Sequence, residues 1–258
     1  MLELKNIYKT FNPGTINEKV ALNGLNLTLN EGDFVTVIGG NGAGKSTMLN
    51  AVAGTWMVDE GQIIIDGKDV TKVPEHKRAA YLGRVFQDPM MGTAATMGID
   101  ENMALAMRRG KSRGLRIGIT QKERNQFREM LKVLDLGLED RLTSKVGLLS
   151  GGQRQRMTIA RAVVKKPDIL ILDDSASALD FATDAKLRMA IRDMENKATV
   201  FIVSQRAASI MYADKIIVLD DGQIVGMGTH EELLKQCEVY QEIYYSQFKK
   251  TEDEKEGR

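Results

Sequence analysis

The stretch GGNGAGKST at residues 39–47 constrains the fold of this chain more than any other feature. It matches the pattern G-x-x-x-x-G-K-[ST] at Gly39, Gly44, Lys45 and Ser46. The apolar run FVTVIG, which ends at Gly39, reads as a short buried strand, and a helix is expected to start after the glycines. Glycines here let successive backbone N–H groups face one anion, and the helix N-terminus adds a positive dipole end. The segment therefore predicts a phosphate-binding loop between a strand and a helix.

A loop of this kind binds a nucleotide through its phosphates. Lys45 is expected to reach the β- and γ-phosphates, and the Ser46 hydroxyl is expected to bind Mg²⁺. The residues predicted to hold the nucleotide are Gly39, Gly40, Asn41, Gly42, Ala43, Gly44, Lys45, Ser46 and Thr47.

Composition narrows the class of protein further. The net charge of +1 gives no overall field that would attract nucleic acid, so no nucleic-acid partner is expected. Cys237 is the only cysteine, which excludes an intrachain disulfide and indicates a reducing compartment. No apolar run approaches the roughly 18 residues of a membrane-spanning helix, so a membrane role is expected to depend on a separate partner or domain.

The order of patterns along the chain predicts an α/β protein. Apolar residues alternate at Leu2 and Leu4 and again from Leu25 to Leu29, which is typical of antiparallel strands with one wet face. GQIIIDGKDV (61–70) predicts a hairpin that turns at Asp66-Gly67. Later strands and helices alternate, which indicates a mostly parallel sheet.

The middle of the chain has a different character. QKERNQFREMLKVLDL places Phe127, Met130, Leu131 and Leu134 on one helical face, and a second helix is expected near 181–195. We expect one domain over 1–248, in which 1–87 and 165–248 form the β-rich core and 88–164 a helical insert. Residues 249–258 form a charged tail.

A second motif, LSGGQRQR, spans residues 149–156. Taken alone it is a Gly-Gly turn before a helix, with Ser150 as N-cap. A functional role for this motif is better supported than a simple turn, because the motif lies between the phosphate-binding loop and ILILDD (169–174). The latter reads as a buried strand that ends in two carboxylates.

Together these segments resemble the nucleotide-binding domain of ABC transporters over residues 1–248, with the motifs in the family's order. The resemblance implies a P-loop NTPase core and two such domains that enclose two ATP molecules head to tail. The expected partners are a second nucleotide-binding domain, in a homo- or heterodimer, and transmembrane transport subunits. The expected location is cytoplasmic, peripheral at the inner face of the cell membrane.

The resemblance also implies roles for single residues. Ser150, Gly151, Gly152 and Gln153 would face the ATP held by the partner domain. Asp173 would hold Mg²⁺, Gln87 would sense the metal and the membrane partner, and Asp180 would lie at the dimer seam. Phe11 matches the aromatic residue that stacks on adenine, with Tyr8 as a rival.

Two residues depart from the family pattern. The catalytic carboxylate is usually Glu and here is Asp174, and the switch residue is usually His and here is Gln205. Aspartate is one methylene shorter, and glutamine cannot acquire positive charge, so both changes weaken hydrolysis more than binding. The pair resembles the degenerate site of heterodimeric ABC exporters. The alternative interpretation is that the chain is a fully active enzyme, which uses Asp174 and Gln205 in these two roles.

The likeness to the family changes along the chain, and more than one role is compatible with it. Residues 1 to about 153 resemble importer subunits, whereas 154–248 resemble exporter domains, which indicates a mosaic joined near the signature. The chain is either an ATPase subunit that drives a transporter or a nucleotide-gated clamp that lends its signature to a catalytic partner. A non-transport ABC ATPase is the weakest candidate, because neither a coiled-coil insertion nor a second copy of the domain is present.

Overall fold

The computed structural model describes residues 1–111, 118–133, 137–173, 189, 191, 198–203 and 213–246. The chain divides into two compact units, one formed by Met1–Glu75 and Thr199–Arg258 and the other by His76–Ala198. We refer to them as the first and the second unit. Both combine strands with helices, so the predicted α/β class is confirmed.

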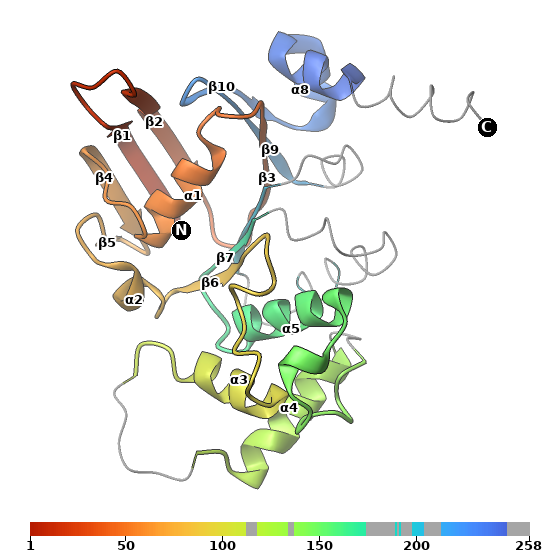
Figure 1. Cartoon of the computed structure of the whole chain (residues 1–258). Helices are drawn as coiled ribbons and strands as arrows, with labels where there is room; N and C mark the ends of the chain where they lie inside the picture. The colour runs from red at the N-terminus through yellow and green to blue at the C-terminus, as the bar shows by residue number, and fades with distance from the viewer. Residues whose placement is uncertain are drawn as a thin grey trace. The chain divides into compact units, whose positions relative to one another are not determined.

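The first unit contains an antiparallel sheet whose strands run in the order β2-β1-β4-β5 (Figure 1). Its strands are β1 (Leu2–Phe11), β2 (Lys19–Leu29), β4 (Glu60–Ile65) and β5 (Lys68–Asp69). The alternating leucines predicted to face inward are all buried. The predicted hairpin joins β4 to β5, and Asp66 and Gly67 both have positive φ, as a tight two-residue turn requires.

A second sheet in the first unit carries the strand that leads into the phosphate-binding motif. Here β3 (Phe34–Gly39) pairs in parallel with β8 (Thr199–Val203) and β9 (Lys215–Asp220), and β10 (Gln223–Gly228) returns antiparallel to β9. Nearly every residue of β3 and β8 is buried, which explains their continuous apolar sequences. The helix α1 (Lys45–Ala53) follows β3, as predicted.

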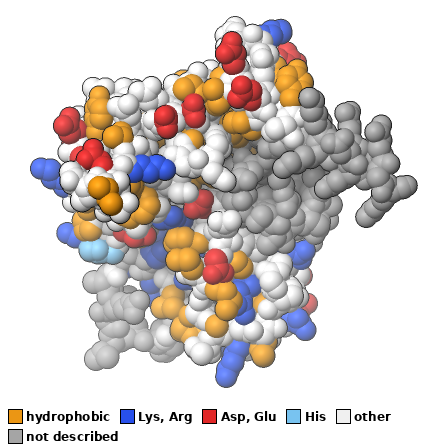
Figure 2. All heavy atoms as spheres, turned by 45° about the horizontal axis from the view of Figure 1, so that its top comes forward, with side chains coloured by type: hydrophobic (Ala, Val, Ile, Leu, Met, Phe, Trp, Pro, Cys, Tyr) orange, Lys and Arg blue, Asp and Glu red, His pale blue; other side chains and the backbone are white. Residues whose placement is uncertain are grey.

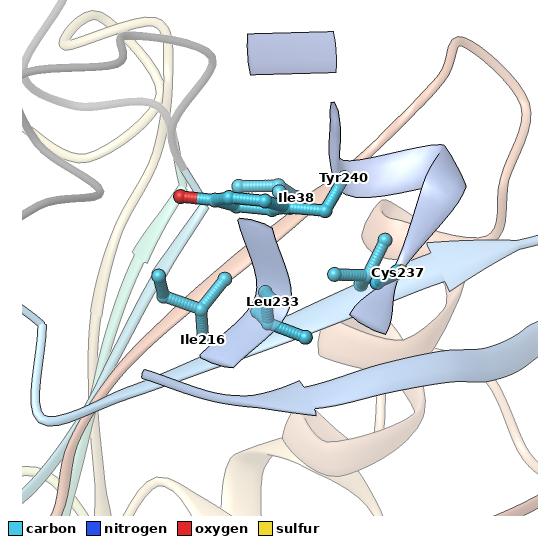
Figure 3. Packing of buried hydrophobic residues seen from close by; sticks show 6 residues of the cluster. Ile38, Ile216, Leu233, Cys237 and Tyr240 are labelled. Atoms are coloured by element: carbon cyan, nitrogen blue, oxygen red, sulfur yellow. The ribbon is translucent and has the colours of Figure 1, made fainter. Parts of the chain in front are cut away.

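The C-terminal helices of the first unit close one part of its core. α8 (His230–Gln236) starts with a capping box of Thr229 and Glu232, and residues 238–246 are also helical. Figure 3 shows Leu233, Cys237 and Tyr240 packed with Ile38 and Ile216 of the sheet. Cys237 is thus a buried packing residue. The hydroxyl of Tyr240 lies 2.6 Å from Nδ1 of His230.

The second unit combines a parallel strand pair with helices. After the short α2 (Glu75–Arg78), which starts at its boundary, it contains the parallel pair β6 (Leu82–Val85) and β7 (Ile169–Asp173). Its helices are α3 (Ile99–Met107), α4 (Gln121–Val133), the 3-10 turn η1 (Val146–Leu148) and α5 (Gly151–Val163). The helix predicted from the 121–134 pattern is confirmed by α4, in which Phe127 and Leu131 are fully buried. Of the helix expected near 181–195, the described part includes Ile191, which is helical and buried.

Strand β6 and helix α5 touch without an intervening side chain. A Cβ atom on Gly83 of β6 would lie 2.5 Å from the carbonyl oxygen of Ala162 in α5 and 2.9 Å from Pro167. Any larger residue would separate the two elements, so glycine at this position sets their distance.

Within the described residues, no helix is both long and apolar enough to cross a membrane. On the face drawn in Figure 2, acidic and basic side chains are interspersed, in keeping with the small net charge of +1.

Candidate functional site

The GGNGAGKST segment forms a tight loop between β3 and α1. Gly39 and Gly44, the first and sixth residues of the motif, have φ of 155° and 101°. A Cβ on Gly39 would lie 2.2 Å from the carbonyl oxygen of Leu219, and one on Gly44 would lie 2.5 Å from that of Ala21. Only glycine fits both positions, so the motif spacing follows from how closely the loop approaches its neighbours.

Lys45 holds a positive charge inside this loop. Its Nζ donates to the carbonyl oxygens of Gly39 at 2.8 Å and Gly40 at 2.7 Å, and the residue is buried. Lys45 is also the first residue of α1, whose first turn contains no acidic residue to offset the positive end of the helix dipole. Asn41, Gly42 and Ser46 are exposed. The loop therefore presents a buried ammonium, a helix N-terminus and exposed backbone to an anion.

Phe11 is the last residue of β1 and is half-buried. Its ring meets Trp56 edge to face, with centroids 4.9 Å apart, and the ammonium of Lys9 lies 5.6 Å from its centroid. The other aromatic candidate, Tyr8, packs over Gly24 of β2. Its hydroxyl lies 2.9 Å from the position that a Cβ on Gly24 would take. Phe11 is thus the aromatic residue held at the end of the strand, next to an exposed tryptophan.

The loop that contains Trp56 is fastened to β1 by Asp59. The Asp59 carboxylate accepts hydrogen bonds from Lys9 Nζ at 2.7 Å and from the Thr10 backbone N–H at 2.6 Å. Burial would raise the pKa of Asp59, but these hydrogen bonds outweigh it and the pKa lies below its usual value. The ionised carboxylate therefore fixes the Trp56 loop against the strand that carries Phe11.

In the second unit, Gln87 and Asp173 come to one edge of the parallel pair. Val85 of β6 is in register with Leu172 of β7, and the two polar residues follow these positions. Asp173 is largely buried and lies 3.8 Å from the guanidinium of Arg84, whereas Gln87 is exposed. Carboxyl ends of adjacent parallel strands are a frequent place for ligand-binding polar groups.

The LSGGQ segment caps helix α5. The Ser150 hydroxyl accepts from the Gln153 N–H at 3.3 Å, and the Gln153 side chain accepts from the Ser150 N–H at 3.1 Å, so the predicted N-cap is confirmed. Arg154 donates to the carbonyl oxygen of Gly147 at 3.0 Å, which holds the preceding turn on the helix. A Cβ on Gly151 would have no neighbour within 4 Å. The result is a capped, exposed helix start led by glycine.

Three residues predicted to take part, Asp174, Asp180 and Gln205, lie outside the described residues. Two described residues were not foreseen, namely Trp56 and Lys19, whose Nζ lies 3.0 Å from where a Cβ on Gly42 would be. No motif marks either of them. The position of Lys19 opposite Phe11 follows only from the register of β1 with β2 in the structure.

A strand that passes through such a loop into a helix, with a buried lysine at the turn, defines a P-loop nucleotide-binding protein. The chain belongs to the ABC transporter family, which matches residues 22–177. It is the ATP-binding subunit of an ABC transporter, an ATPase.

Individual relatives agree with this assignment. The tyrosine transport ATP-binding protein of Clostridioides difficile (strain R20291) is 35% identical over 233 residues, which cover 87% of this chain and 90% of that protein. The spermidine/putrescine import ATP-binding protein PotA of Haemophilus ducreyi (strain 35000HP / ATCC 700724) is 36% identical over 92% of this chain, and the match spans 60% of that relative's length.

A solved structure shares the fold. The dimeric structure of a bacterial ABC transporter cassette, MJ0796, superposes with a TM-score of 0.77 at 31% identity, covering 89% of this chain and 98% of that one. The same cassette has also been solved as a dimer in a post-hydrolysis state bound to ADP and Pi.

Proposed function

We propose that this chain binds Mg·ATP in the 39–47 loop and pairs head to tail with a second nucleotide-binding domain, so that ATP binding closes the pair and drives transport. Phe11 stacks on the adenine, and the signature residues of each domain complete the ATP site of the other. Transmembrane subunits hold the chain as a peripheral protein at the cytoplasmic face of the membrane. In this proposal residues 1–248 act as one ABC-type domain, and 88–164 carry the signature.

The exposed start of helix α5 at Ser150 is the main support for the proposal that two nucleotide-binding domains pair head to tail. It is exposed, led by glycine and without an acidic residue in its first turn. These properties suit contact between backbone N–H groups and a phosphate that approaches from outside the chain. The capping box already satisfies the N–H groups of Ser150 and Gln153, so Gly151 and Gly152 present theirs to the partner's ATP.

The residues proposed for the metal are suited to Mg²⁺, which prefers oxygen ligands. Ser46 offers an exposed hydroxyl, Asp173 a carboxylate and Gln87 an exposed amide oxygen. Bound Mg²⁺ would neutralise phosphate charge. The 39–47 loop itself orients the nucleotide through Lys45 and its backbone N–H groups.

Hydrolysis by this chain is proposed to be slow. At Asp174 the carboxylate is one methylene shorter than the family's Glu and falls short of an attacking water, and Gln205 cannot donate from a charged ring as His can. The alternative function is a nucleotide-gated clamp with little turnover of its own, which lends its signature to a catalytic partner. The Asp174 and Gln205 pair favours that alternative, since the same two changes leave the residues of ATP binding intact.

The test of turnover is the Asp174→Glu, Gln205→His double variant beside the unmodified chain. A misplaced base typically loses about 10²–10⁴-fold in rate, so the double variant is expected to hydrolyse ATP faster by at least the lower end of that range. ATP affinity, measured by calorimetry, serves as control and is expected to stay the same. Equal turnover in both proteins would show that Asp174 is an adequate base.

The test of binding is Lys45→Ala. Its charge-assisted contact is worth about 1.5–3 kcal/mol, so ATP affinity is expected to fall by roughly 10- to 150-fold. Lys45 also bonds to Gly39 and Gly40, so a thermal melt of the variant must accompany the titration. Unchanged affinity in a folded variant would rule out the 39–47 loop as the ATP site.

A further inference from the structure

Lys19 brings a second ammonium to the phosphate-binding loop. It is the first residue of β2, and its Nζ lies 3.0 Å from the position of a Cβ on Gly42, the fourth residue of the loop motif. Lys45 serves the same loop from within, bonded to the carbonyl oxygens of Gly39 and Gly40. Two lysines from different elements therefore lie at the same loop.

Within the part of the chain that the structure describes, the charge of Lys19 is not neutralised by a carboxylate. Among the described residues nothing pairs with its ammonium, and its side chain is exposed. The neighbouring carboxylate of Glu18 is turned to the N–H of Gly14, at 2.6 Å. An unpaired cation beside a helix N-terminus and a lysine-containing loop adds to a positive potential that only an anion relieves.

The strand register links Lys19 to the aromatic residue of the site. Phe11 and Lys19 are directly opposite each other across the β1–β2 pair. Residues opposite in an antiparallel pair have Cβ atoms about 4.5–5.5 Å apart, so one strand end holds an aromatic ring and a cation side by side. The cation is the member of this pair that reaches the loop.

We infer that Lys19 is a further nucleotide-binding residue, which contacts the phosphate chain of a nucleoside di- or triphosphate between the ring of Phe11 and the 39–47 loop. This inference rests on the proposed ATP site in that loop. It adds a specificity element, because a residue that reads phosphate charge favours nucleotides over nucleosides. It also gives a chain with slow turnover a further means to retain ATP.

The test is a calorimetric titration of the full chain with Mg·ATP for three variants. Lys19→Ala is expected to weaken ATP binding by about 5- to 20-fold, and Lys19→Arg is expected to restore affinity to within about threefold. Lys68→Ala is the matched control, since it removes the same charge from β5, at the opposite edge of the same sheet from β2. It should bind as the unmodified chain does. The ATP affinity of Lys19→Ala should also depend less on salt concentration.

The outcomes separate this inference from the function on which it rests. Loss of affinity in Lys45→Ala with no change in Lys19→Ala would overturn the role of Lys19 and leave the ATP site in place. No change in either variant would overturn the site itself. A Lys19→Ala variant that melts well below the unmodified chain and is not rescued by arginine would show a structural role and refute the inference.

Discussion

Gly151→Asp is the change that best distinguishes an ATP-binding chain from an ATP-driven clamp. Gly151 is the first residue of α5, and a Cβ there meets nothing within 4 Å, so the folded chain can accommodate the new side chain. A carboxylate in the first turn interacts favourably with the helix dipole by about 0.3–1 kcal/mol. The melting temperature of the variant should therefore stay the same or rise slightly.

Gly151→Asp is expected to weaken the ATP-dependent pairing of two chains, although it does not destabilise the single chain. If the partner's γ-phosphate docks at this helix start, a carboxylate about 4 Å away repels it by roughly 4 kcal/mol at an effective dielectric near 20. That corresponds to about a thousandfold weaker association. ATP bound in the chain's own 39–47 loop is proposed to feel no such repulsion, so its affinity should be nearly unchanged.

Light scattering with and without ATP measures pairing, and fluorescence of Trp56, the single tryptophan, follows ATP binding by the monomer. Gly151→Asn is the matched control, because it adds a side chain of nearly the same shape without the charge. We expect it to weaken pairing less than Gly151→Asp does. If Gly151→Asp still dimerises with ATP, or if its monomer loses ATP binding, then the proposed role of the signature in the partner's site is wrong.

Two further predictions concern the first unit. Asp59→Asn should destabilise the chain at neutral pH: the folded pKa of Asp59 is lowered, so its contribution is present above about pH 3.9 and is lost as the pH falls through the folded pKa. The difference in stability between variant and unmodified chain, measured by urea unfolding followed by Trp56 fluorescence, should therefore shrink below about pH 4, and an unchanged difference would contradict this. Tyr240→Phe removes the hydroxyl that bonds to His230 but keeps the buried ring. It should cost about 0.5–1.5 kcal/mol and lower the melting temperature by roughly 1–6 °C, whereas an unchanged calorimetric melt would count against the contact.

The sequence predicted those features that depend on local pattern. The strand at 34–39, the turn at Asp66-Gly67, the helix from Gln121 and the N-cap at Ser150 each follow from residues within a few positions of one another. Their physical causes, namely hydrophobic periodicity, positive φ and capping, act over the same short range.

Features that depend on pairing between distant segments were not predictable. The inward alternation of β1 breaks after Leu4, where Asn6 adopts a positive φ and the register with β2 shifts before Ile7. Asn6 is of a residue type that tolerates positive φ, but nothing in the sequence shows that the chain uses this conformation inside the strand. The position of Lys19 at the loop depends on β2 lying beside β1 and on the loop reaching the start of β2. Neither is encoded in a local pattern.

The contact at Gly83 gives the second unit a mechanical property. Gln87 lies four residues beyond Gly83 on the chain that continues β6, and the signature lies at the far end of α5, a helix about 20 Å long. Near Ala162 the backbone of β6 contacts the backbone of α5 directly, because Gly83 has no side chain. No side chain between them could adjust its conformation to absorb a shift. We therefore expect a displacement of β6 to be passed on to α5, and a small tilt of α5 near Ala162 to move Ser150, at the other end of the helix, by a larger distance. We expect a bulkier residue at position 83 to change the direction of α5 relative to β6 while the 39–47 loop keeps its sequence.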